Sequence, residues 1–185
     1  MVSAEDAISI YEGLLANGIR LWLTGGWGID ALIRKQSRPH KDLDVITLVD
    51  DVAAMRELLC QDGYSLKELW SENRWVVDTS RAETATAFVF HDSFGREIDV
   101  HAIRLDDQGK GLPAWEAEGR IFEKQDLAGE GLIAGIAVKC LSPEMQMSCH
   151  SGYDLPAWQL RDLEFLHEKF GVEYPGDHSD NPMSA

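Results

Sequence analysis

The stretch that decides the fold is LTGGWGIDAL, residues 23–32, and RPHKDLDV, residues 38–45, follows it after a short connection. The first segment places two adjacent glycines between an apolar run typical of a β-strand and an apolar run typical of a helix. The second segment leads into a strand that carries aspartates at two alternate positions. The two segments therefore predict a strand, a side-chain-free turn, a helix and a second strand with a pair of carboxylates.

The glycine pair suggests a site for a phosphate group. Gly25 and Gly26 have no side chains that would cover the backbone N–H groups at the start of the helix. These N–H groups and the positive end of the helix dipole attract anions. The connection to the next strand adds cationic side chains, which are Arg34, Lys35, Arg38, His40 and Lys41. For the glycines alone, the alternative is a tight strand-to-helix turn that binds no ligand.

The two aspartates suggest a metal ion beside that phosphate. Residues two apart on a β-strand project from the same face, so Asp42 and Asp44 point together while Leu43 and Val45 point to the core. Neighbouring carboxylates repel each other unless a cation lies between them. Mg²⁺ is the natural partner because it prefers carboxylate oxygen and keeps positions for phosphate and water. With the glycine turn and the basic connection, the pair predicts a site for a nucleoside triphosphate.

The best candidate for a third carboxylate lies in REIDVHAI, residues 96–103. Read as a strand, this segment places Glu97, Asp99 and His101 on one face and apolar residues on the other. Acidic side chains in such a strand are costly unless they are exposed or bound to a cation. Asp99 is the preferred third carboxylate because its flanking residues resemble those of the first pair. An exposed strand position is the alternative, and His101 is expected to be a neighbour or a packed histidine.

The remaining patterns predict a sheet with helices. Ser3 begins a first helix that ends near Gly18, and a helix from Asp50 or Asp51 to about Cys60 follows the second strand. Further strands are predicted at residues 19–23, 64–70, 75–79, 87–90, 97–103 and, weakly, 120–123, and later helices begin at Ser142 and near Pro156. This order indicates an α/β sheet domain with a small C-terminal helical part.

The composition limits what the protein binds. The 185 residues include 17 Lys and Arg against 32 Asp and Glu, which gives a net charge of −15. Nucleic acid is therefore not expected as the main partner, because binding its phosphates needs clustered basic residues. An acidic cleft would instead concentrate a cationic small molecule. The alternative is an acidic surface that serves solubility alone.

Cysteine spacing and apolar runs bear on the compartment. Cys60, Cys140 and Cys149 lack the spacing of a disulfide framework or a zinc site, which favours a reducing compartment. The N-terminal residues do not resemble a signal peptide, and no apolar run approaches the roughly 18 residues that span a bilayer. We expect a cytoplasmic protein without a membrane partner.

Together the motifs resemble those of a known superfamily. The patterns GG-W-x-[IV]-D, RPH-x-D-[IL]-D and E-I-D-[VI]-H resemble the nucleotidyltransferases with a DNA-polymerase-β-like core, and more narrowly the lincosamide and aminoglycoside 2″-nucleotidyltransferases. The matching residues are Gly25–Asp30, Arg38–Asp44 and Glu97–His101. The likeness is specific over residues 19–48, fair over 96–103 and looser near the C-terminus. The resemblance implies a mixed sheet flanked by helices, α/β (α+β) in class.

One departure from the superfamily concerns the residue after the glycine pair. Many members carry serine there, whose hydroxyl helps to hold phosphate, whereas Trp27 stands here, as in the antibiotic-modifying group. Phosphate binding is then expected to rely on the backbone of Gly25 and Gly26, on Thr24 and on nearby Arg or Lys side chains. Asp30 is expected to support local structure.

The resemblance implies transfer of a nucleoside monophosphate, usually AMP from ATP, to a hydroxyl of an acceptor. Asp42 and Asp44 would hold Mg²⁺ against the triphosphate, and Asp99 would share a second Mg²⁺ and help to remove the proton of the acceptor. Arg38 and His40 would contact phosphate or organise their loop. The acceptor would be a small antibiotic, an aminoglycoside or a lincosamide. The resemblance also suggests a homodimer.

The C-terminal half is expected to shape the acceptor site. We predict a nucleotidyltransferase core at residues 1–110, an acceptor-shaping segment at 111–173 that packs as one unit with the core, and a disordered tail at 174–185. Candidate acceptor contacts are the aromatic residues Trp70, Trp75, Tyr153 and Trp158 and the acids Glu72, Glu83, Glu116 and Glu118. The net charge favours a cationic aminoglycoside, whereas the loop similarities favour a lincosamide. The alternative for each aromatic residue is a place in the core, and the alternative for each acid is a place on a solvated surface.

Three other functions fit parts of the pattern. A related transferase could modify a protein, as nucleotidylating antitoxins of this superfamily do. A nucleotide-binding module without catalysis is a second alternative, which the complete set of three aspartates disfavours. A metal-dependent hydrolase using His40 and His101 is a third, and the absence of closely spaced histidine ligands disfavours it.

Overall fold

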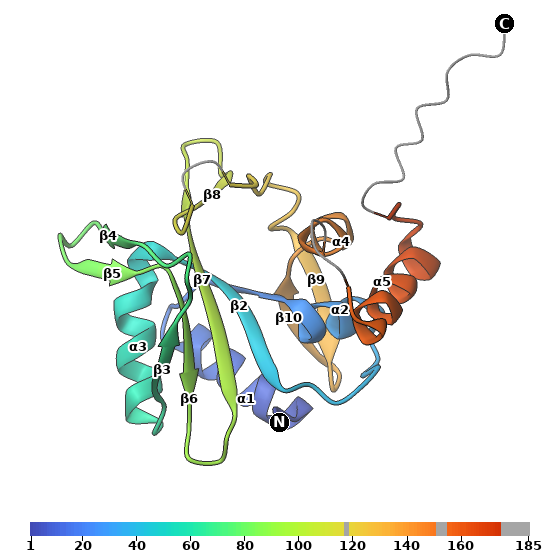
Figure 1. The fold of residues 1–185 in the computed structure, drawn as a ribbon, viewed down its shortest axis with the longest axis horizontal. Helices are drawn as coiled ribbons and strands as arrows, with labels where there is room; N and C mark the ends of the chain where they lie inside the picture. Colours follow the sequence, from blue (N-terminus) through green and yellow to red (C-terminus); the bar gives the residue numbers. More distant parts are fainter. Residues whose placement is uncertain (117–118, 151–154, 175–185) are drawn as a thin grey trace, which may run out of the picture.

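The fold is built on a mixed sheet of eight strands. The computed structural model describes residues 1–116, 119–150 and 155–174. The strands are β1 (Leu21–Thr24), β2 (Asp42–Leu48), β3 (Ser65–Leu69), β6 (Ala87–His91), β7 (Glu97–Leu105), β8 (Gly111–Pro113), β9 (Gly129–Ile133) and β10 (Ile136–Cys140). They follow the order β3–β6–β7–β2–β1–β10–β9, and β8 pairs with β7 (Figure 1). A separate two-stranded ribbon joins β4 (Trp75–Val77) to β5 (Glu83–Ala85).

Both parallel and antiparallel pairs occur in this sheet. Strand β2 pairs with β7 in parallel and with β1 in antiparallel register. Strand β10 lies parallel to β1 and antiparallel to β9. The predicted α/β (α+β) class with a mixed sheet flanked by helices is therefore confirmed.

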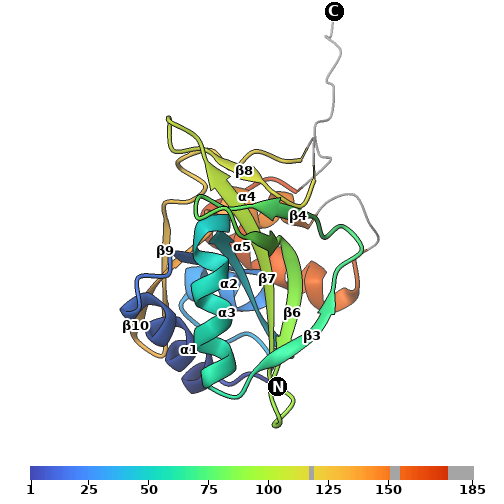
Figure 2. The same ribbon diagram turned by 90° about the vertical axis from the view of Figure 1, so that its left-hand side faces the viewer.

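Within the described ranges, five α-helices and one short 3-10 turn surround the sheet. They are α1 (Ala4–Ala16), α2 (Gly25–Ile33), the 3-10 turn Val49–Asp51, α3 (Val52–Gln61), α4 (Pro143–Cys149) and α5 (Ala157–Phe170). Helices α1 and α3 lie together against one face of the sheet (Figure 2), whereas α2, α4 and α5 gather at its β10–β9 end (Figure 1). The tyrosine hydroxyl of α1, Tyr11, accepts a hydrogen bond from the backbone N–H of Lys139 in β10 at 2.8 Å.

The two faces of β2 have different neighbours. Leu43 and Val45 belong to the main core, to which α1, α2, α3 and α5 also contribute. On the opposite face, Asp42 and Asp44 precede Ile46 and Leu48, which belong to a second apolar cluster. One face of a single strand therefore changes along its length from carboxylates to buried hydrocarbon, as the alternation of the sequence predicts.

The predicted helix starts at Ser3 and Ser142 are confirmed. Ser3 and Asp6 form a reciprocal capping box at the start of α1. Ser142 caps α4, with Pro143 in its first turn. Gly171 ends α5 in a left-handed conformation with φ 70°.

The segment between residues 106 and 141 differs from the prediction. The weak strand expected at 120–123 is wrong, because only an isolated bridge pairs Gly111 with Phe122. The strands β9 and β10 had not been expected, although they join the sheet beside β1. Two glycines in β9 lower its local strand propensity, and tertiary packing explains at least one of them. A Cβ atom on Gly131 would lie 2.4 Å from the backbone carbonyl of Ala31 in α2.

No helix in the described ranges is both long and apolar enough to cross a membrane. Cys60, Cys140 and Cys149 are free thiols, and burial raises the pKa of Cys140 to about 12. Cys140 therefore behaves as a packed apolar side chain within β10.

Replacing Gly131 should destabilise the protein. In Gly131→Val the new side chain meets the backbone of α2 rather than a flexible side chain, so helix and strand must move apart. We expect a loss of roughly 1–3 kcal/mol in the free energy of unfolding, measured by urea denaturation. The matched control is Gly13→Ala, where nothing lies within 4 Å and α1 should gain up to about 1 kcal/mol. Equal stability of Gly131→Val and the wild type would contradict the close contact between α2 and β9.

Candidate active site

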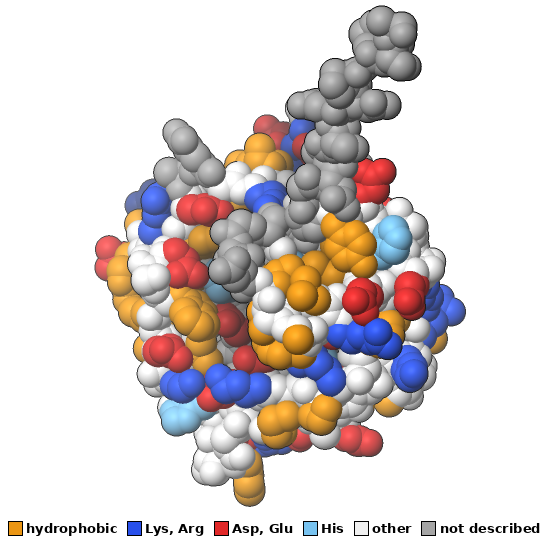
Figure 3. Space-filling model, turned by 45° about the vertical axis from the view of Figure 1, so that its right-hand side comes forward, with side chains coloured by type: hydrophobic (Ala, Val, Ile, Leu, Met, Phe, Trp, Pro, Cys, Tyr) orange, Lys and Arg blue, Asp and Glu red, His pale blue; other side chains and the backbone are white. Residues whose placement is uncertain are grey.

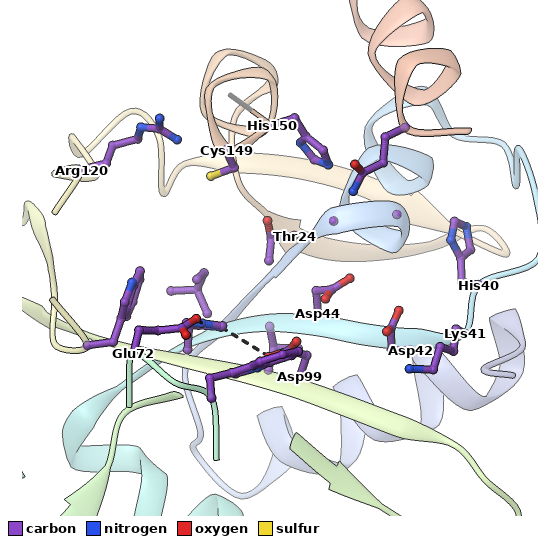
Figure 4. Close-up of a pocket in the computed structure, with 18 of the residues that line it drawn as sticks. Thr24, His40, Lys41, Asp42, Asp44, Glu72, Asp99, Arg120, Cys149 and His150 are labelled. Atoms are coloured by element: carbon purple, nitrogen blue, oxygen red, sulfur yellow. Dashed lines mark hydrogen bonds and ion pairs between the residues drawn. The ribbon is translucent and has the colours of Figure 1, made fainter. Parts of the chain in front are cut away.

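A cleft of about 1450 Å³ opens over the carboxylate-bearing face of β2 and β7. Residues from α2, α4, α5 and the segment after β8 complete its walls. Figure 3 shows carboxylates in a recess flanked by apolar side chains, with Lys and Arg side chains along one edge. Figure 4 shows Asp42, Asp44 and Asp99 on neighbouring strands, with Thr24 above them. The cleft therefore contains the predicted carboxylates and is also bordered by both turn glycines, Gly25 and Gly26.

Strand register brings the three aspartates together. Asp44 and Asp99 are direct partners across the parallel β2–β7 pair, and Thr24 is the partner of Asp44 across β1–β2. Asp42 lies two residues before Asp44 on the same face and pairs with Glu97. The three carboxylates thus occupy adjacent positions on one side of the sheet, although 55 residues separate Asp44 from Asp99 in the sequence.

The surroundings of Asp44 strongly disfavour its negative charge. Burial is the main reason that its pKa lies well above the usual value, and repulsion from Asp42 and Asp99 raises it further, while Arg38 opposes the shift. The pKa of Asp42 is also raised, by burial first; Lys41 opposes the shift and Asp99 adds to it. Desolvated, mutually repelling carboxylates of this kind favour a bound cation.

Asp99 takes part in a network at one end of the cleft. The indole N–H of Trp70 donates to Oδ1 of Asp99 at 2.9 Å, and Nδ1 of His101 lies 3.4 Å from the same oxygen. Nε2 of His101 lies 3.4 Å from Glu72, and its ring packs edge-on against Trp115. Burial lowers the pKa of His101, but the two acids outweigh it and the net shift is upward. This network holds Asp99 at the floor of the cleft.

The glycine turn leaves no room for side chains. Gly25 has φ +56°, and a Cβ atom there would lie 2.2 Å from Oδ2 of Asp44. A Cβ atom on Gly26 would lie 2.3 Å from Nδ1 of His40 and 2.9 Å from the guanidinium of Arg38. The positive φ and the close approach both require glycine at position 25. The backbone at the start of α2 therefore lies against the carboxylate and the basic residues without an intervening side chain.

His40 and Asp30 form a buried pair behind this turn. Nε2 of His40 lies 2.5 Å from Oδ2 of Asp30, and each side chain is 2% exposed. Both carboxylate oxygens of Asp30 also accept from the backbone N–H of Ser37. The ring of Trp27 packs against His40 at 4.6 Å between centroids, and Trp27 is itself buried. Asp30 thus ties α2 to the connection that follows it, consistent with the structural role expected for it.

Arg38 links the glycine turn to the C-terminal helix. Its Nη2 and Nε donate to Oδ2 of Asp162 in α5 at 2.7 and 3.1 Å, and Asp162 is 2% exposed. Its guanidinium also lies over the ring of Trp158, 4.3 Å from the centroid. Because two groups of α5 hold it, Arg38 has a defined position beside Gly26. The side of the cleft that was expected to bind phosphate is therefore shared between α2 and α5.

Helix α4 fixes the residue before the glycines. Oγ1 of Thr24 donates to Oε1 of Gln146 at 3.1 Å, and Nε2 of Gln146 donates to the backbone carbonyl of Leu23 at 3.3 Å. Gln146 is fully buried, and a Cβ atom on Gly28 would lie 2.2 Å from its amide nitrogen. This packing sets where β1 ends and α2 begins.

The structure brings most of the sequence-predicted residues to one place. The cleft is lined by Thr24, Gly25, Gly26, Arg38, His40, Asp42, Asp44 and Asp99, and also by Trp70, Glu72, Glu116 and Trp158. Trp75 and Glu83, on the β4–β5 ribbon, are not among its lining residues. Tyr153 and Glu118 lie outside the described residues, as does the tail from 175 onward.

Sequence reasoning missed several residues of the cleft and its supports. They are Trp115, Phe122, Gln146, His150, Gln159 and Asp162. Only Asp162 had a local signal, because it stands on the buried side of α5 together with Leu163 and Leu166. A carboxylate at such a position is costly unless it is paired.

The donor set of the cleft suits a hard divalent cation. Asp42 and Asp44 offer desolvated carboxylate oxygens whose mutual repulsion a cation would relieve. In the portion of the chain that the structure describes, no group of three His, Cys, Asp or Glu side chains is arranged to hold a metal ion. Asp99 is engaged at Oδ1 by Trp70 and His101. The three-aspartate metal site therefore stays a prediction, supported by its oxygen donors and their unfavourable charge.

Comparison with known proteins identifies the family. The sequence model of the aminoglycoside-2″-adenylyltransferase family matches residues 6–166. The chain belongs to this family. It is therefore a nucleotidyltransferase of the adenylyltransferase type, and the resemblance seen in its motifs is confirmed. A lincosamide resistance protein of Staphylococcus haemolyticus is 30% identical over 148 residues, which cover 80% of this chain and 84% of that protein.

Solved structures show the same fold. The lincomycin-bound lincosamide antibiotic adenylyltransferase LnuA superposes with a TM-score of 0.74 at 25% identity, over 89% of this chain and 96% of that one. ANT(2″)-Ia in complex with adenylyl-2″-tobramycin superposes with a TM-score of 0.62 at 20% identity, over 87% of both chains. The latter likeness concerns the fold alone.

Neutralising Asp44 should stabilise the metal-free protein at neutral pH. Since the folded-state pKa of Asp44 is raised, ionisation of this carboxyl costs stability. The cost is absent below the unfolded-state pKa of about 3.9, grows as the pH rises through that value and is complete above the folded-state pKa. We expect Asp44→Asn to raise the Tm at pH 7 by a few degrees and the gain to shrink toward pH 4.

The matched control for this experiment is Asp107→Asn, at an exposed position outside the cleft. It should leave the Tm unchanged at every pH. A lower Tm for Asp44→Asn at pH 7, or a gain independent of pH, would show that the carboxylates are not under electrostatic strain.

Proposed function

We propose that this protein transfers AMP from ATP, with Mg²⁺, to a hydroxyl of a lincosamide or aminoglycoside antibiotic. The observation that carries the proposal is the convergence of Asp42, Asp44 and Asp99 beside the Gly25–Gly26 turn in one cleft. Membership of the adenylyltransferase family supports the same reaction. A metal-dependent hydrolase has less support, because His40 is buried against Asp30.

Each part of the cleft has a role in this reaction. Asp42, Asp44 and Asp99 would hold Mg²⁺, which supplies charge neutralisation for the triphosphate when bound. The backbone N–H groups at the start of α2 bind phosphate oxygens. Arg38 is held beside Gly26 and adds positive charge there. We assign to His40 the organisation of the connection, because Asp30 occupies its Nε2.

The chemical step is an in-line displacement at phosphorus. The acceptor hydroxyl forms a bond to the α-phosphorus as the bond to pyrophosphate breaks. Asp99 takes the proton of that hydroxyl, because it faces the end of the cleft bordered by Trp70 and Glu72. Pyrophosphate leaves beside the glycine turn and the basic side chains.

We propose a lincosamide as the first acceptor to test. The acceptor end of the cleft presents the aromatic side chains Trp70, Trp115 and Phe122. Among the described lining residues, the acids outside the aspartate set are Glu72 and Glu116, and Glu72 is already paired with His101. A surface of this kind favours an amphipathic molecule with few charges over a polycation, since each ammonium group needs its own acidic partner. The identity to the lincosamide resistance protein agrees with this choice.

The decisive experiment mixes purified protein with ATP, Mg²⁺ and either lincomycin or tobramycin. We expect pyrophosphate release that depends on the acceptor, and an acceptor mass gain of one AMP. Labelling of the protein itself, or binding of ATP without turnover, would contradict the proposal. Release of inorganic phosphate without an AMP adduct would do so as well.

Loss of a single aspartate should abolish the transfer. Asp44→Asn and Asp99→Asn should each lower kcat by roughly a thousandfold or more, because charge stabilisation at phosphorus depends on these carboxylates. Far-ultraviolet circular dichroism should show folded protein in both cases. The exposed Asp107→Asn provides the matched control and should keep wild-type turnover. Wild-type kcat in Asp44→Asn would refute the assigned site.

A further inference from the structure

The wall of the cleft opposite the carboxylates carries a histidine that the proposed mechanism does not use. His150 is the last residue of α4, its C-cap, and it lines the cleft although it is only 7% exposed. Figure 4 shows His150 and Cys149 across the cleft from Asp42 and Asp44, with Thr24 between the two walls. A ligand bound over the aspartates therefore has His150 on its other side.

One ring nitrogen of His150 is fixed, and the other faces the cleft. Nδ1 lies 2.8 Å from the backbone carbonyl oxygen of Gln146 and must carry a proton there, because a carbonyl only accepts. Nε2 has no hydrogen-bond partner among the described residues and is not enclosed by them either. The bond to Gln146 thus sets the orientation of the ring and leaves Nε2 as the atom that a ligand can reach.

Helix α4 places this ring beside the glycine turn. The side chain of Gln146 accepts a hydrogen bond from Oγ1 of Thr24 at 3.1 Å, and Thr24 directly precedes Gly25. Two successive hydrogen bonds therefore connect the imidazole of His150 to the residue at which the turn begins. Gln146 is fully buried, so this connection is rigid. His150 consequently has a defined position relative to the backbone N–H groups at the start of α2.

We propose that Nε2 of His150 donates a hydrogen bond to a phosphate oxygen of the bound nucleotide. The inference rests on the proposed function, because it takes this cleft as the triphosphate site. A divalent cation held by Asp42 and Asp44 neutralises the phosphate oxygens on the carboxylate side only. His150 supplies a donor on the opposite side, and its ring takes up the second proton from solvent. With both nitrogens donating, the ring is positively charged and the bond to phosphate is charge-assisted.

Two substitutions separate this role from a purely structural one. The amide nitrogen of asparagine can take the place of Nδ1, so His150→Asn keeps a donor for the carbonyl of Gln146 and removes the atom that faces the cleft. The longer side chain of glutamine brings its amide nitrogen to the place of Nε2, so His150→Gln restores a donor to the cleft. A structural role would be preserved better by asparagine, and the proposed role better by glutamine.

The test measures equilibrium binding of inorganic tripolyphosphate and of ATP, each with MgCl₂ and without any acceptor. We expect His150→Asn to weaken both ligands roughly tenfold, because a hydrogen bond to a charged group is lost, and His150→Gln to bind within about threefold of the wild type. Binding of lincomycin alone should be the same in the wild type and both variants.

The matched control is His167→Asn. Nδ1 of His167 also lies close to a backbone carbonyl oxygen, that of Val172 at 2.9 Å, but the residue is exposed and does not line the cleft. This variant should bind tripolyphosphate as the wild type does.

A measurement on the wild type keeps the test decisive if a variant does not melt cooperatively. Nitrogen-15 NMR distinguishes a ring nitrogen that carries a proton from one that does not. We expect Nε2 of His150 to carry a proton in the complex with tripolyphosphate and MgCl₂ at pH 7.

Equal binding of tripolyphosphate by the wild type and His150→Asn would overturn the inference, as would a loss that His150→Gln does not reduce. An unprotonated Nε2 in the complex, or weaker binding of lincomycin in place of tripolyphosphate, would overturn it too. Failure of the proposed function is a different result. A protein that adenylylates no antibiotic but loses tripolyphosphate affinity in His150→Asn alone would refute the function and support the role of His150.

Discussion

The structure depends on the parallel pairing of β2 with β7, because this register brings three negative charges to one side of the sheet. Asp44 and Asp99 are direct partners, and Asp42 projects from the same face. Burial and mutual repulsion raise the pKa of Asp44 and Asp42. In the absence of a cation, ionisation of these two carboxyl groups therefore lowers the stability of the fold. The core on the opposite face of the strands, which includes Leu43 and Val45, offsets that cost. An unfavourable electrostatic arrangement is thus supported by favourable packing on the other side of the same strands.

The glycine turn is the second constraint, and it depends on the first. Gly25 must be glycine both because of its positive φ and because the carboxylate of Asp44 lies where a Cβ atom would be. Elements distant in the sequence then fix the turn. Gln146 of α4 binds Thr24 and the end of β1, and Asp162 of α5 holds Arg38 beside Gly26. The C-terminal helices therefore fix the side of the cleft that contains the glycine turn.

Local sequence patterns predicted those features of the site that depend on a single strand or a single turn. The alternation in β2 and β7 placed the acidic and apolar faces correctly, and the glycine pair marked the start of α2. The hairpin of β9 and β10 was not predicted because glycines lower the strand propensity of β9, and the close packing of Gly131 against Ala31 is not visible in the sequence. Trp115, Phe122 and Gln159 could not be assigned to the cleft, because nothing in their local patterns distinguishes a cleft aromatic or amide from a surface one.

What the sequence by itself determined was the family, the fold class and the common strand face of the three aspartates, since short-range spacing sets which face of a strand a side chain occupies. Only the tertiary structure decided which strand lies beside β2, that α5 holds Arg38, and that Gln159 lines the cleft. The physical reason is the distance along the chain over which each kind of interaction acts. Periodicity and turn chemistry act over a few residues, whereas strand register, desolvation and ion pairing are determined by segments that meet only when the chain is folded.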